Sequence, residues 1–263
     1  MLKDITLGQF FPGKSVVHRL DPRVKLTLVT LFVVALFAAR GIYPYALVFG
    51  WLAYAIIASR LSLKIFFKGL RPLIFILAFT AILNMLYTPG EALFSWWIIR
   101  ITREGLIMAA YMMSRILMLV TGTFLLTYTT SPIMLTDALE RVLKPLRKIR
   151  VPVHELAMMM TIALRMIPTL IEETQKIMSA QKSRGADFES PNLIKRVKAM
   201  IPLLVPLFVS AFQRAEDLAI AMECRCYNGG VGRTRMRVLH MGFIDYVALA
   251  VTIALCAAVF ILR

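Results

Sequence analysis

"GLIMAAYMMSRILMLVTGTFLLTY", residues 105–128, contains only one charged side chain, Arg115. A helix needs roughly 20 consecutive apolar residues to cross the hydrocarbon core of a bilayer, so this stretch predicts a transmembrane helix. A second run of comparable length lies at 241–262. Three shorter apolar runs, which need flanking residues to span, lie at 26–39, 42–59 and 72–87. The sequence therefore predicts an all-α membrane protein with about five transmembrane helices.

The overall composition agrees with a membrane location. Of 263 residues, 59% are hydrophobic and 17% are charged, whereas about 25% of the residues in a soluble domain are charged. A net charge of +16 would suggest a nucleic-acid partner in a soluble protein. Most Lys and Arg residues, however, lie in 1–25, 60–71 and 129–242, which five spans would place on one side of the bilayer. We therefore expect a lipid bilayer and no nucleic acid as partner.

The same distribution predicts the orientation of the chain. Lys and Arg are enriched in cytoplasmic loops, so the basic segments predict a cytoplasmic N-terminus and an extracellular C-terminus. Residues 1–128 would then hold a cytoplasmic lead-in and the first four spans, 129–240 a cytoplasmic region, and 241–263 the last span. The segment "ALFSWWII", residues 92–99, is too short to cross and carries two Trp, so we expect it at the membrane interface.

The cytoplasmic region is expected to contain three amphipathic helices. The first covers 135–149, where leucines recur at helical spacing with Lys and Arg on the other side. The second covers 153–184 and the third runs from about 192 to 225, each with a continuous apolar face. At 1.5 Å per residue, each of these two long helices would measure about 50 Å.

Both long helices end in an arginine with an alanine four residues before it. "SAQKSRGA" contains Arg184, and "AMECRCY" contains Arg225. One interpretation is electrostatic, because cations at helix C-termini are favoured by up to about 1 kcal/mol. The other is a pair of docking devices, because a planar guanidinium at a helix end can enter a groove of a neighbouring protein and bind several acceptors. The repetition of the design favours docking.

Four motifs in order along the chain carry a family resemblance. They are "HRLDPRVKL" (18–26), "ALRMIPTLIEE" (163–173), "AQKSRGAD" (180–187) and "AMECRCY" (221–227). With these motifs the chain resembles the transmembrane (T) component of energy-coupling-factor (ECF) vitamin transporters, and the resemblance extends over most of the chain.

The resemblance implies a non-catalytic subunit without a cofactor in a bacterial or archaeal cell membrane. It would bridge two ABC-type ATPases, identical or different, and a substrate-binding membrane protein, the S component, with the two long helices as coupling helices. The vitamin or metal ion carried would be chosen by the S component, so this sequence does not identify it.

The resemblance also implies site residues. Those for ATPase docking are Arg184, Arg225, Ser183, Gly185, Ala180, Ala221, Glu223 and Cys226; those for the coupling-helix scaffold are Arg165, Pro168 and Glu172; those of the N-terminal motif are Asp21, Pro22 and Arg23. Cys226 departs from the family pattern, which has Gly after the second arginine. This difference puts the tight turn at the end of the second long helix in doubt.

Two other functions compete with this interpretation. A conventional ABC importer permease should carry Glu-Ala-Ala-x-x-x-Gly at its ATPase contact, and the segment 179–185 matches only Ala180 and Gly185. A membrane-embedded enzyme acting on an anionic lipid-linked substrate would need a catalytic constellation, which we do not find. The phosphate-loop pattern "GQFFPGKS", residues 8–15, lacks the strand before it and the helix after it that phosphate binding requires.

Two further features, a pair of cysteines and an arginine within a span, are considered as sites. Cys224 and Cys226 fall short of the four ligands of a structural zinc site, so no metal is expected. Arg115 lies near the middle of a predicted span, where a charge normally faces a partner or a cavity. It would serve either a structural role or a contact with the S component.

Overall fold

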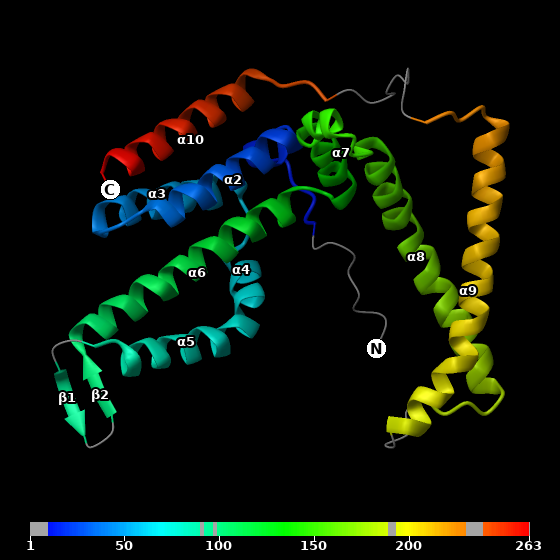
Figure 1. Ribbon diagram of the computed structural model, residues 1–263, viewed down its shortest axis with the longest axis horizontal. Helices are drawn as coiled ribbons and strands as arrows, with labels where there is room; N and C mark the ends of the chain where they lie inside the picture. Colours follow the sequence, from blue (N-terminus) through cyan, green and yellow to red (C-terminus); the bar gives the residue numbers. More distant parts are fainter. Residues whose placement is uncertain (1–9, 90–91, 97–98, 189–192, 230–238, 263) are drawn as a thin grey trace. The chain divides into compact units, whose positions relative to one another are not determined.

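The computed structural model describes residues 10–89, 92–96, 99–188, 193–229 and 239–262 (Figure 1). In chain order its helices are α1 (Val16–Arg19), α2 (Pro22–Ala38), α3 (Ile42–Ser59), α4 (Leu63–Leu70), η1 (Arg71–Leu73), α5 (Ile74–Tyr87), α6 (Arg103–Thr129), α7 (Pro132–Val142), η2 (Lys144–Ile149), α8 (Val153–Ser183), α9 (Leu193–Cys224) and α10 (Phe243–Ile261). The two strands β1 (Ala92–Trp96) and β2 (Ile99–Thr102) pair in antiparallel fashion; β1 lies in the segment 92–99 expected at the interface, and β2 begins at the last residue of that segment.

The described residues form two compact units. The first, called the bundle unit, comprises 10–138 and 239–262, and the second, called the long-helix unit, comprises 139–229, each with the gaps given above. The division falls within α7. It therefore groups α1 to α6 with α10, and α8 with α9.

Six helical segments of the described chain are long and apolar enough to cross a membrane. They are 42–59, 63–85, 103–129, 153–183, 197–224 and 243–261. The predicted all-α membrane protein is thus confirmed. Two of the six are the long helices expected in the cytoplasm, and length and composition alone do not separate them from spans. The predicted first span is α2, whose 17 residues are close to the minimum for crossing.

The core of the bundle unit lies between α2, α3, α6 and α10. Phe32 and Leu36 of α2, Val48 of α3 and Val259 of α10 are almost completely buried in it. Gly122 allows the close approach of α6, because a Cβ atom at this position would lie 2.6 Å from the ring of Phe32. Figure 1 shows α10 running beside α2 and α3, so helices from both ends of the sequence pack together in this bundle.

The long-helix unit is built on the contact between α8 and α9, which cross in Figure 1. Few side chains of this pair are buried: Val153 and Ala157 in α8, and Leu203 among the described side chains of α9. Apolar residues along α9 remain exposed, including Val197, Phe208 and Phe212. A packed core therefore does not hold the two helices together along their length.

Candidate functional site

The end of α8 is a tight left-handed turn. The amide of Gly185 donates to the carbonyl of Lys182 at 3.0 Å, and the amide of Ala186 donates to the carbonyl of Gln181 at 3.0 Å. This pair of hydrogen bonds is the Schellman motif, which requires a residue with positive φ just beyond the helix. Gly185 supplies it with φ of 87°, and Arg184 is the capping residue of the helix.

The end of α9 repeats this turn bond for bond. The amide of Cys226 donates to the carbonyl of Glu223 at 2.8 Å, and that of Tyr227 donates to the carbonyl of Met222 at 3.0 Å. Cys226 adopts φ of 54° in the position of Gly185. The doubt about the turn is therefore resolved: cysteine forms it, although a side chain in this conformation costs about 1–2 kcal/mol.

The eight residues assigned to docking are all exposed at these two helix ends: Ala180, Ser183, Arg184, Gly185, Ala221, Glu223, Arg225 and Cys226. Arg184 and Arg225 occupy the same position relative to their turns. In the described part of the chain, neither guanidinium forms an ion pair. These two exposed cations at equivalent turns can therefore bind acceptors without first breaking an ion pair within the described residues.

The contact that joins α8 to α9 involves Glu173. Its Oε2 lies 2.6 Å from Nη2 of Arg214, and its other carboxylate oxygen accepts a hydrogen bond from the hydroxyl of Ser210. The scaffold residues expected from the sequence, Arg165, Pro168 and Glu172, are exposed on α8. Sequence reasoning thus named the neighbour of the residue that makes the contact.

A signal for this pair was present in the sequence. Glu173 stands eleven residues before Arg184, and Arg214 stands eleven residues before Arg225. Opposite charges at matching distances from two matching motifs indicate a contact between the two helices. Finding them requires aligning the helices on their ends.

The N-terminal motif lies in the bundle unit, where it connects the starts of two helices. Asp21 caps α2 by accepting from the amide of Arg23 at 2.9 Å, and Pro22 is the first residue of that helix. The backbone amide of Asp21 donates to Oδ1 of Asp245 at 2.8 Å. Nη2 of Arg23 donates to the carbonyl of Leu239 at 3.2 Å. Asp21 and Arg23 thus attach the start of α2 to α10 and to the segment before it, and Pro22 begins α2.

Arg115 is held within the bundle unit by aromatic residues. Its Nε donates to the hydroxyl of Tyr45 at 2.7 Å. The guanidinium carbon lies 5.6 Å from the ring centre of Tyr45 and 5.7 Å from that of Phe37, which are cation–π distances. These contacts connect α6 to α3 and α2, and they favour the structural one of the two roles considered for this residue.

The described residues contain no group of three or more His, Cys, Asp or Glu side chains able to hold a metal ion. All three cysteines are free thiols, Cys224 and Cys226 exposed and Cys256 buried.

Comparisons with known proteins identify the family. Residues 13–237 match the family described as "Cobalt transport protein" (CbiQ). The chain is 51% identical to the energy-coupling factor transporter transmembrane protein EcfT of Clostridium kluyveri, covering 99% of this chain and 96% of the relative. The chain belongs to the family of energy-coupling factor transporter transmembrane proteins, EcfT. EcfT of Acidaminococcus fermentans is 48% identical, with 100% and 98% covered, and EcfT of Thermosediminibacter oceani is 51% identical, with 95% of each covered.

Membership of the EcfT family agrees with the structure. The chain is a multi-pass membrane protein and the transmembrane component of an energy-coupling factor transporter. The four motifs that carried the resemblance all fall in ordered helices or at their ends: the N-terminal motif at α2, the second along α8, and the two arginine motifs at the turns after α8 and α9.

Proposed function

We propose that the chain couples ATP hydrolysis by two cytoplasmic ABC-type ATPases to uptake of a vitamin or metal ion through a separate S component. It catalyses no reaction itself. Arg184 and Arg225 each dock in a groove of one ATPase, with Ser183, Gly185, Ala180, Ala221, Glu223 and Cys226 shaping the two contacts. The observation that carries this proposal is the equivalence of the two turns, each presenting one exposed arginine.

The coupling helices are proposed to lie on the cytoplasmic side of the membrane. Arg165 and Glu172 are both exposed near the middle of α8. A charge facing lipid at the centre of a span costs about 2.5–3.5 kcal/mol on insertion scales. The five spans are then α2, α3, α4 with α5, α6 and α10, which gives a cytoplasmic N-terminus and an extracellular C-terminus. In this arrangement, residues 1–128 hold the cytoplasmic lead-in and the first four spans, 129–240 form the cytoplasmic region, and 241–263 form the last span.

Cysteine labelling tests this topology. The native cysteines are replaced by serine, and a single cysteine is introduced by Asp187→Cys or by Asn228→Cys, next to the two turns. In sealed cells, a membrane-impermeant maleimide should label neither position, and after permeabilisation it should label both. Labelling of only one position from outside would overturn the five-span topology.

The docking proposal is tested by charge reversal of both arginines. Breaking a buried charged contact costs about 2–5 kcal/mol, and reversal costs more, so Arg184→Glu with Arg225→Glu should abolish co-purification of both ATPases and uptake. Lys176→Glu with Lys198→Glu is the matched control, because both lysines are exposed on the same two helices and the change in charge is equal. Retention of both ATPases and of uptake in the arginine variant would contradict docking.

The composition of the purified complex separates this function from the conventional importer. Affinity purification from native membranes should yield two ATPases and a small separate membrane protein that binds the substrate. A complex of ATPases with two large permease subunits and no such protein would instead support a conventional ABC importer.

A further inference from the structure

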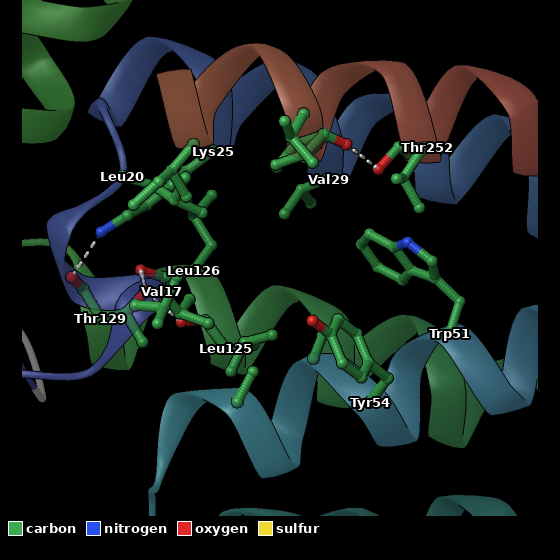
Figure 2. Close-up of a pocket in the computed structure, with 18 residues that line it drawn as sticks. Val17, Leu20, Lys25, Val29, Trp51, Tyr54, Leu125, Leu126, Thr129 and Thr252 are labelled. Atoms are coloured by element: carbon green, nitrogen blue, oxygen red, sulfur yellow. Dashed lines mark hydrogen bonds between the residues drawn. The ribbon is translucent and has the colours of Figure 1, made fainter. Parts of the chain in front are cut away.

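The bundle unit contains a cavity of about 280 Å³ between its helices. Figure 2 shows two facing walls, with Thr252 on α10 and with Trp51 and Tyr54 on α3. Side chains of α2 and α6, including Val29 and Leu125, line the space between these walls. The short helix α1 closes one end.

Lys25 and Thr252, two polar residues of the cavity lining, already have hydrogen-bond partners. The ammonium of Lys25 donates to the carbonyl of Thr129 at 2.9 Å and to the hydroxyl of Thr130 at 3.3 Å, and it also reaches the carbonyl of His18 at 3.3 Å. The hydroxyl of Thr252 donates to the carbonyl of its own helix at Ala248, 2.9 Å away. The remaining lining is mainly aliphatic and aromatic. The cavity therefore suits an apolar ligand.

The cavity opens at the outer surface of the bundle unit, and its α3 wall is held in place by aromatic stacking. Tyr54, Val251 and Ile244, all in its lining, are more than half exposed. Trp51 stacks on Phe32 with ring centres 5.6 Å apart, which fixes the shape of the α3 side. Because α3, α6 and α10 are long and apolar enough to cross a bilayer, the medium that reaches this opening consists of lipid acyl chains.

We propose that this cavity binds one acyl chain of a membrane phospholipid. Protein interiors are packed as densely as organic crystals, so an apolar space of this size that opens to lipid is filled by lipid. The bound acyl chain contacts α3 and α10 at the same time and thereby joins α10, the last helix, to the bundle. This role depends on the membrane location of the bundle unit and not on the ATPases.

The positions of the lining residues along their helices indicate how the phospholipid is oriented in the cavity. Lys25 and Ile244 stand near the starts of α2 and α10, and Thr129 is the last residue of α6, so one end of the cavity is at the helix ends. Tyr54 lies five residues before the end of α3, or about 7 Å along the helix. Its hydroxyl has no hydrogen bond among the described residues and can donate to an ester carbonyl, as tyrosines at membrane interfaces do. In the proposed orientation, the lipid belongs to the cytoplasmic leaflet.

Photo-crosslinking of the full-length protein tests the proposal. The protein is reconstituted in phosphatidylcholine vesicles that contain a trace of phosphatidylcholine with a diazirine on one acyl chain, and crosslinked residues are mapped by mass spectrometry. Cavity residues should be labelled at least fivefold more than Val34, which is exposed on α2 outside the cavity. Equal labelling of Val34 and the cavity would overturn the site.

Two substitutions on one helix provide the matched comparison. Ala248→Trp places an indole in the lining and should reduce cavity labelling at least fivefold. Ala250→Trp, exposed on the same helix but outside the lining, should leave it unchanged. Wild-type labelling in a folded Ala248→Trp variant would refute the proposal. If this variant does not fold, Val29→Phe fills the cavity from α2 and carries the same expectation. Displacement of all labelling by free fatty acid, but not by unlabelled phosphatidylcholine, would refute a phospholipid as occupant.

Discussion

Glu173 of α8 and Arg214 of α9 form an ion pair, and each stands eleven residues before the arginine that ends its helix. Eleven residues make close to three helical turns and about 16 Å of length. Arg184 and Arg225 therefore lie on nearly the same helix faces as the ion pair and at equal distances from it. If the two long helices couple the ATPases to uptake as proposed above, we expect this pair to act as a pivot through which the movement of one helix end is transmitted to the other helix.

The first prediction concerns this pivot. Glu173→Arg leaves two cations facing each other and removes the acceptor of the Ser210 hydroxyl, so the α8–α9 contact should weaken by about 1.5–3 kcal/mol, as expected for hydrogen bonds to charged groups. Uptake should fall while the ATPases remain bound. Spin labels at positions 187 and 228 should show a broader distance distribution by pulsed electron paramagnetic resonance.

The double variant Glu173→Arg with Arg214→Glu is the control for this prediction. It restores opposite charges and should recover most of the uptake and the narrow distance distribution. An uptake in the double variant no better than in Glu173→Arg alone would show that the pair does not set the geometry of the two helices.

The second prediction concerns the left-handed turn at Cys226. Cys226→Gly removes the cost of placing a side chain at φ of 54° and should stabilise the end of α9 by about 1 kcal/mol. Hydrogen exchange at the amide of Tyr227 should slow accordingly, with ATPase association retained. Cys224→Gly, at the last residue of α9, should instead destabilise the helix by about 0.3 kcal/mol. Identical exchange in both variants would mean that the turn is not strained.

The sequence predicted the two long helices well because apolar runs and helix stops are local signals. The single helix expected at 135–149 was wrong, because α7 ends at Val142 and the 3-10 helix η2 follows it. The termini of α8 and α9 fall within about a residue of those expected from Arg184 and Arg225. Contacts between distant segments were less accessible: Asp245 binds the amide of Asp21 across 224 positions. Choosing Glu173 instead of Glu172 for the helix contact requires the rotation of α8 about its axis. The sequence also could not establish that Cys226 forms the left-handed turn, because its positive φ is held by the two hydrogen bonds of that turn.

The third prediction concerns the junction between α2 and α10. Asp245 is buried and accepts from two backbone amides, those of Asp21 and Gly242, each at 2.8 Å. Asp245→Ala leaves both amides without this acceptor, and each loss should cost about 1–3 kcal/mol. The thermal unfolding midpoint in detergent should fall clearly. Asp245→Asn keeps one carboxamide oxygen as acceptor and should fall by less, so equal midpoints for alanine and wild type would contradict the role assigned to Asp245.

The fourth prediction uses the equal spacing of the two arginines from the pivot. Inserting one alanine after Lys176 rotates Arg184 by about 100° relative to Glu173 and moves it by about 1.5 Å. Arg184 would then face away from its groove, so uptake should be lost while the Glu173–Arg214 contact and Arg225 remain in place. Full uptake in the Lys176 insertion variant would show that docking tolerates any orientation of the helix end, which a rigid turn presenting a single guanidinium does not allow.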